Sequence, residues 1–182
     1  MSTNGLEVFD RTLETTHIWL KEICEELGPD KHIAWKVLSV VLQKLRDRLP
    51  LPLAAHLGAQ LPLLVRGVYY DQFEPGRLPN ERKSREEFIH EVHEALRDTR
   101  PVNPDQAIRC VFGVLSRHVS EGQIRKICDA LPHGMRQLWE REQAPEAAGE
   151  RRPEGRAGVE PIRSEERRTE PEPLILTEAN QL

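Results

Sequence analysis

A leucine-proline pair inside an apolar segment occurs twice in this sequence, each time in the same setting. Residues 59–70 read AQLPLLVRGVYY and residues 129–140 read DALPHGMRQLWE; in both, an arginine follows the proline by four residues and an aromatic residue follows the arginine by three. Proline has a fixed φ and lacks a backbone N–H, so it suits the first position of a helix and cannot continue the helix before it. Each pair therefore predicts a corner where one helix ends and the next begins with almost no loop.

The spacing of apolar residues is helical along most of the chain. Gly28-Pro29 is a typical stop after a first apolar face. Asp30 then fits the cap of a helix over about 31–48, which is apolar around most of its circumference, so we expect it in the centre of the domain. No segment shows the alternation that predicts a β-strand. The first apolar face consists of Trp19, Leu20, Ile23, Cys24 and Leu27.

Three later positions have the residue types that begin helices. A serine with a glutamate or glutamine three residues on matches the capping box, in which each side chain bonds the other residue's backbone N–H. An asparagine before a proline combines a cap with a first-turn proline. The three predicted starts are Ser84 with Glu87, Ser120 with Gln123, and Asn103-Pro104 with Gln106.

The two halves of the chain align as a repeat. When Ala34 is placed on Ala107, the next apolar positions coincide, and the two Leu-Pro corners coincide after three residues around position 49 are treated as extra. We therefore predict an all-α domain over 6–140, made of two tandem repeats of about four helices, 6–73 and 84–140. The coinciding positions are Val37, Leu38, Val41 and Leu42 with Cys110, Val111, Val114 and Leu115.

The composition changes after residue 142. Residues 143–173 contain no aromatic residue and five prolines, and glutamate alternates with arginine. Such a segment cannot bury enough apolar surface to offset its ordering entropy, so residues 143–182 are predicted to be a disordered tail. Its last residues, LILTEANQL, are interpreted either as a frayed end or as a short docking motif.

Composition also limits the partners and the cellular compartment that we expect for this protein. The formal net charge of −4 argues against strong nonspecific attraction to nucleic acid, although a local basic patch could survive that average. The three cysteines show no paired spacing, the N-terminus lacks the pattern of a signal peptide, and no apolar run is long enough to cross a membrane. We expect a soluble cytoplasmic protein without a membrane partner.

No motif predicts catalysis or a cofactor. The segment HEVHE at 90–94 places His90 and His93 three residues apart, whereas the zinc motif of metalloproteases needs a spacing of four, so an exposed polar helix face explains it better. Phosphate-binding loops, dinucleotide-binding loops and nucleophile elbows are absent from the sequence. We expect no metal, no cofactor and no enzymatic activity.

The segment between the two halves is the strongest candidate for a binding surface. Tyr69, Tyr70 and Phe73 precede a Pro/Gly-rich connector that carries Arg77. Aromatic residues beside a connector suit a partner surface, but they could equally fold inward and fill the seam between the repeats. The candidate surface is completed by Arg66 and by its counterparts in the other repeat, Arg136 and Trp139; for both arginines a structural role, stacking on the ring or pairing with a carboxylate, is favoured.

Five segments of the chain read THIWLKEICEELG, AWKVLSVVLQKLRDRLP, LAAHLGAQLPLLVRGVYYDQFEP, SREEFIHEV and ALPHGMRQLW. Together they resemble a bacterial family called domain of unknown function 2267. The resemblance covers about residues 6–140 and omits the tail. It implies an all-helical bacterial domain, and it implies no activity.

These observations favour a non-enzymatic protein-interaction or adaptor module with an unidentified protein partner, and they leave homo-oligomerisation open. The alternative is a regulatory protein that contacts nucleic acid, and a third reading is an enzyme with its site between the repeats. The basic residues on which the nucleic-acid alternative depends are Lys44, Arg46, Arg48, Arg66 and Arg82.

Overall fold

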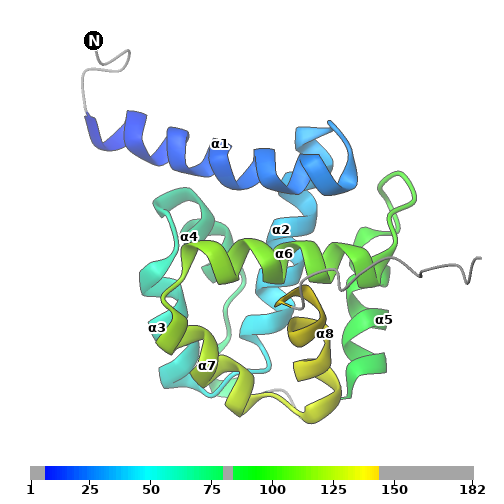
Figure 1. Cartoon of the computed structure of the whole chain (residues 1–182). Helices are drawn as coiled ribbons and strands as arrows, with labels where there is room; N and C mark the ends of the chain where they lie inside the picture. Colours follow the sequence, from blue (N-terminus) through cyan, green and yellow to red (C-terminus); the bar gives the residue numbers. More distant parts are fainter. Residues whose placement is uncertain (1–6, 80–83, 144–182) are drawn as a thin grey trace, which may run out of the picture. The chain divides into compact units, whose positions relative to one another are not determined.

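The computed structural model describes residues 7–79 and 84–143 of the chain (Figure 1). These residues form eight α-helices and one short 3-10 helix, and no β-strand occurs among them. The all-α prediction is thereby confirmed, whereas the predicted tail at 144–182 lies outside the described residues. The elements are α1 Glu7–Leu27, α2 Lys31–Arg46, α3 Leu51–Gln60, α4 Leu63–Tyr70, η1 Pro75–Arg77, α5 Arg85–Leu96, α6 Pro104–His118, α7 Glu121–Ala130 and α8 His133–Gln143.

The turn from α1 into α2 forms where the sequence predicts it. Gly28 has a φ of +101°, a region that residues with a side chain rarely adopt, and its N–H donates to Cys24 O at 2.9 Å. The Asp30 side chain then accepts from the backbone N–H of His32 and Ile33. One glycine and one aspartate thus end α1 and begin α2.

Helices α2 and α6 form the centre of the domain. Helix α2 contacts α1, α4, α5 and α6, and α6 contacts α1, α2, α5, α7 and α8. Both helices are buried over most of their length; for α2 this confirms what the apolar circumference of 31–48 predicts. Helices α1, α4, α5, α7 and α8 each contact at least one helix of this pair, whereas α3 packs against α4 and α7.

The predicted helix starts are correct, but two of the predicted glutamine contacts are wrong. Ser84 and Glu87 form a complete capping box. Asn103 caps α6 as expected, but the Gln106 amide donates to Glu26 O rather than to its own cap. Ser120 makes no side-chain cap bond, and the Gln123 amide is directed toward Leu53 O. Both glutamines lie beside the ends of neighbouring helices, so carbonyls of those helices accept the hydrogen bonds from the glutamine amides.

The two Leu-Pro corners have nearly the same backbone geometry. Leu61 has φ −79° and ψ 146°, and Leu131 has φ −88° and ψ 147°. Each leucine is buried and each proline carbonyl accepts the first bonds of the helix that follows. Pro62 precedes α4 by one residue instead of occupying its first position, since its own ψ of 151° is extended. The predicted direct corners are otherwise confirmed.

Candidate functional site

Two members of the predicted surface are core residues. Tyr69 and Trp139 are each at most 1% exposed, so neither can belong to an exposed surface, and this part of the prediction is wrong. The Tyr69 hydroxyl donates to Ala54 O at 2.8 Å, and burial raises the pKa of this phenol. The Trp139 indole N–H donates to Ser116 Oγ at 2.7 Å. Both rings therefore stabilise the corners that they follow.

Arg66 and Arg136 bond the helix ends beside them. Arg66 Nη2 donates to Ala59 O at 2.9 Å and to Leu61 O at 3.0 Å. Arg136 Nε donates to Cys128 O at 3.1 Å. Carbonyls at a helix C-terminus lack partners within the helix, and these guanidinium groups supply them. The role is structural, but carbonyl capping takes the place of the predicted ring stacking or carboxylate pairing.

The segment after Tyr69 packs against the end of α2. Tyr70 is half-buried and meets the rings of Tyr69 and Phe73 edge to face at 5.0 and 5.4 Å. The Arg46 guanidinium lies 4.9 Å from the Phe73 ring centre and donates to the carbonyls of Tyr69 and Asp71. The structure thus brings together Tyr69, Tyr70 and Phe73, while Arg136 and Trp139 lie at the other corner.

Arg77 is exposed and pairs with Glu74 at 2.8 Å. It lies on η1, and an exposed pair of this kind contributes little to stability.

The basic residues of the nucleic-acid alternative do not form a free surface. Arg46 and Arg48 are 3% exposed, and Lys44 pairs with Glu91 at 3.8 Å. Arg66 is committed to carbonyls, as described above, and Arg82 lies outside the described residues. Phosphate contacts need exposed cations. The described residues therefore give this alternative no support.

An apolar stripe on α1 is covered at one end and uncovered at the other. Phe9, Leu13, Thr16, Leu20 and Ile23 follow one another at alternating spacings of four and three, so they lie on one face of the helix. Thr16, Leu20 and Ile23 are buried, whereas Phe9 is 47% and Leu13 40% exposed. Figure 1 shows the N-terminal end of α1, in dark blue, extending past the other helices. Val8, beside the stripe, is also exposed.

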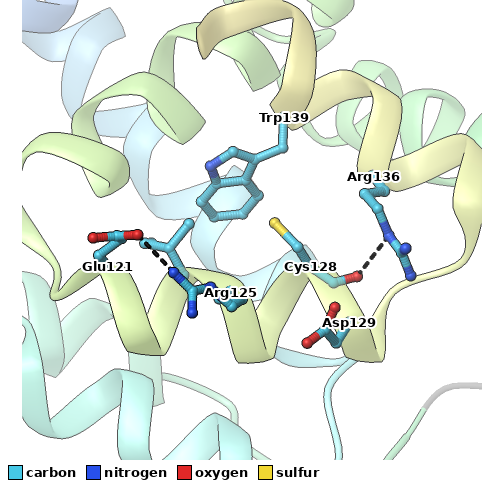
Figure 2. A pocket seen from close by; sticks show the side chains of 7 residues that line it. Glu121, Arg125, Cys128, Asp129, Arg136 and Trp139 are labelled. Carbon is cyan, nitrogen blue, oxygen red and sulfur yellow. Dashed lines mark hydrogen bonds and ion pairs between the residues drawn. The ribbon is translucent and has the colours of Figure 1, made fainter.

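A pocket of about 350 Å³ opens between α7 and α8 (Figure 2). Ile124 and Trp139 are buried at its floor, and the Cys128 thiol is directed toward the Trp139 ring. The pocket is within the size range of small-molecule sites and combines apolar walls with charged groups at its rim. Its lining residues are Glu121, Ile124, Arg125, Cys128, Asp129, Arg136 and Trp139.

No metal site is found in the part of the chain that the structure describes. No group of three or more histidine, cysteine, aspartate or glutamate side chains is close enough there to hold an ion. His90 and His93 are exposed on α5, as an exposed polar face predicts. Within the same ranges, none of the helices is long and apolar enough to cross a membrane.

The fold and these sites define an all-helical domain with an uncovered apolar face on α1 and an open pocket between α7 and α8. Residues 16–138, more than half of the chain, match the model of a family described as uncharacterized conserved proteins, DUF2267. The chain belongs to this family, which confirms the resemblance seen in the sequence. No curated protein matches the chain.

Sequence reasoning did not select the stripe of α1, and of the pocket it named only Arg136 and Trp139, as part of a partner surface. The apolar spacing of α1 is visible in the sequence back to Phe9, but periodicity alone does not show where the covering helices stop. The pocket has a weaker signal, since Cys128 and Glu140 stand where the other corner has Gly58 and Tyr70.

Proposed function

We propose that the protein is a non-enzymatic protein-interaction module and that its contact element is the N-terminal half of α1. The observation that carries the proposal is the stripe of Phe9 and Leu13, which continues a buried helix face into solvent. An isolated apolar residue on a surface is ordinary, but a stripe at helical spacing is the pattern with which helices pack on one another. The backbone of α1 is already hydrogen-bonded, so side chains would make the contact.

The partner that fits this face is an amphipathic helix with basic flanks. Along the uncovered half of α1, Glu7, Asp10 and Glu14 outnumber a single base, Arg11, which gives a net charge of −2; Asp10 lies nearest the stripe, and Glu7 and Glu14 lie further around the helix. Arg11 already pairs with Glu7 at 3.0 Å. A second copy of α1 would bring two acidic segments together, which disfavours self-association, whereas lysine or arginine beside an apolar stripe would be attracted.

We further infer that the domain is built from two four-helix repeats. The proposal is supported by the two similar Leu-Pro corners. It is also supported by the arginine of each corner, which donates to the carbonyl of the leucine in its own corner. In this alignment Arg85, the first residue of α5, corresponds to Thr12. Residues Glu7–Arg11 of α1 are then an addition to the repeat, which agrees with a role outside the packing of the domain.

The proposed setting is the bacterial cytoplasm. In the part of the chain that the structure describes, no disulfide joins Cys24, Cys110 or Cys128, which agrees with a reducing compartment.

The test compares two variants of the full chain that change exposed apolar residues on opposite sides of α1. Phe9→Ser with Leu13→Ser removes the stripe; Ile18→Ser, whose side chain is 46% exposed on the other side of the helix, is the matched control. Proteins retained from the native extract by immobilised wild type are identified and purified. Their binding to each variant is then measured by calorimetry, after circular dichroism has shown that both variants are folded.

Support requires a purified partner that binds the wild type and the Ile18→Ser control alike, binds the double variant at least about tenfold more weakly, and contacts α1 with a basic amphipathic helix. The affinity should fall as salt is added. Equal binding to all three proteins would overturn the proposal. So would a homodimer in light scattering that the double variant alone dissociates, since the partner would then be a second copy.

A further inference from the structure

The corners α3–α4 and α7–α8 share their backbone path but differ in what fills the groove beside them. One sequence offset relates Leu61 to Leu131, and the arginine five residues after each leucine donates to that leucine's carbonyl. The same offset relates several residues around each groove, so the two grooves can be compared position by position. The compared pairs are Ala55 with Arg125, Gly58 with Cys128, Tyr69 with Trp139, and Tyr70 with Glu140.

In the first corner the chain fills the groove with its own aromatic ring. Tyr70 lies directly over Gly58: a Cβ at that glycine would be 2.7 Å from Tyr70 Cζ, closer than real contacts allow. The Tyr70 hydroxyl ends 3.5 Å from Ala55 O. The backbone of such a corner therefore accommodates a single phenol ring, with the polar end of the ring beside position 55.

In the second corner the corresponding groove is open. The residue after Trp139 is a glutamate rather than a tyrosine, and the pocket of about 350 Å³ lies over α7. The floor of the pocket is made by Ile124, by the Cys128 thiol and by the buried Trp139 ring. Sulfur and indole surfaces both pack favourably on aromatic rings. These walls suit an aromatic ring, but such a ring would lie over the Cys128 thiol rather than against the backbone of α7, because the Cys128 side chain takes space that the Tyr70 ring occupies over Gly58 in the first corner.

In the second corner an arginine occupies the position whose backbone carbonyl lies near the polar end of the ring in the first corner. Arg125 occupies the position of Ala55, and it pairs with Glu121 at 2.7 Å on the rim of the pocket. Both side chains of the pair are at least 70% exposed, so the pair is weak and its carboxylate can be exchanged for another. Arg136 brings a second guanidinium to the rim (Figure 2). An anionic group on the ring would therefore replace Glu121 as the partner of Arg125.

We propose that the pocket between α7 and α8 binds a small aromatic carboxylate. The ring lies against Ile124, Cys128 and Trp139, and the carboxylate accepts hydrogen bonds from Arg125 in place of Glu121. This site is separate from the uncovered stripe of α1 and does not depend on the partner proposed for it.

The test uses phenylacetate and its neutral analogue phenylacetamide, titrated into the full chain. The indole N–H resonances of Trp19, Trp35 and Trp139 are followed by NMR. The Trp139 resonance should shift and saturate with phenylacetate while the other two stay in place. Phenylacetamide should bind at least about fivefold more weakly because it offers no charge to Arg125.

Three variants test the geometry. Arg125→Ala should weaken phenylacetate binding, and Glu121→Gln should strengthen it because the competing carboxylate is gone; both residues are exposed, so folding is retained. Cys128→Gly with Glu140→Tyr installs the Gly58 and Tyr70 pair in the second corner, and binding should disappear because the chain then fills its own pocket.

The absence of a saturable Trp139 shift overturns the proposal. Equal affinity for phenylacetate and phenylacetamide, or unchanged binding in Arg125→Ala, overturns the role of the arginine. If the variant with Cys128→Gly and Glu140→Tyr does not fold, the opposite effects expected for Arg125→Ala and Glu121→Gln still test the proposed site.

Discussion

Glu22 lies on α1 between two side chains of α6. Arg117 Nε donates to its Oε2 at 2.7 Å, and His118 Nε2 is 2.6 Å from its Oε1. Burial alone would raise the pKa of Glu22, but the hydrogen bonds from His118 and Arg117 outweigh it, so the pKa is lowered from its ordinary 4.5. The ionised carboxylate is therefore favoured by folding, and it links α1 to α6 beside the contacts that Glu26 makes with Gln106 and Arg117.

Glu22→Gln should make the free energy of unfolding less dependent on pH in the acidic range. Because the pKa of Glu22 is lower in the folded state, its contribution is present above the unfolded value and is lost as the pH falls through the folded one. At pH 7 the variant should be less stable by about 1 kcal/mol, and the gap to wild type should close as the pH falls below about 4.5. Urea unfolding at several pH values measures this. The exposed Glu25→Gln is the control, and a gap that stays constant with pH would contradict the prediction.

At the scale of the helix, two glycines of the α3–α4 unit have opposite surroundings. Gly58 on α3 is covered by Tyr70, whereas a Cβ at Gly67 on α4 would have nothing within 4 Å. Glycine in a helix interior lowers the free energy of unfolding relative to alanine. It is therefore the more stabilising residue only where a neighbouring group occupies the space that a Cβ would take. The close approach of Tyr70 is such a need at Gly58, and no comparable need exists at Gly67.

Alanine at these glycines should therefore change stability in opposite directions. Gly67→Ala should raise the free energy of unfolding by about 0.5 to 1 kcal/mol through helix propensity. Gly58→Ala should lower it by about 1 kcal/mol or more, since the new methyl group displaces the Tyr70 ring. Thermal unfolding of the two variants beside wild type provides the measurement. Stabilisation by both would show that Tyr70 moves aside without cost.

At the scale of the whole domain, a buried ion pair joins the first four helices to the second four. Arg48, after the end of α2, places Nη2 3.2 Å from Oε1 of Glu91 on α5, and its Nη1 donates to Lys44 O. Its guanidinium also lies 4.8 Å from the ring centre of Phe88. The Arg48 side chain is 1% exposed, so loss of its partner would leave a cation without compensation in the interior.

Glu91→Ala should destabilise the domain by about 3 kcal/mol, as expected when one member of a buried pair is removed. Glu94→Ala, on the same helix, should change stability by less than about 0.5 kcal/mol because Glu94 pairs with Arg97 in solvent. Urea unfolding followed by both circular dichroism and tryptophan fluorescence gives both values. Similar effects of the two substitutions would show that the buried pair does not hold the halves together.

Local patterns in the sequence determined the helical architecture of this protein. Helical spacing, the caps at Asp30, Ser84 and Asn103, the stop at Gly28 and the Leu-Pro corners all act between residues a few positions apart, so each can be recognised without knowing the fold. The same residues were sufficient to place the chain in its family.

Tertiary structure decided which of the prominent residues are exposed. Tyr69 and Trp139 resemble surface aromatics in the sequence, yet helices distant in the chain cover them. Phe9 and Leu13 resemble core residues, yet the covering helices end before them. The pocket likewise depends on whether a ring fills the space beside α7. Burial is set by the helix that lies opposite, and periodicity along one helix carries no information about that neighbour.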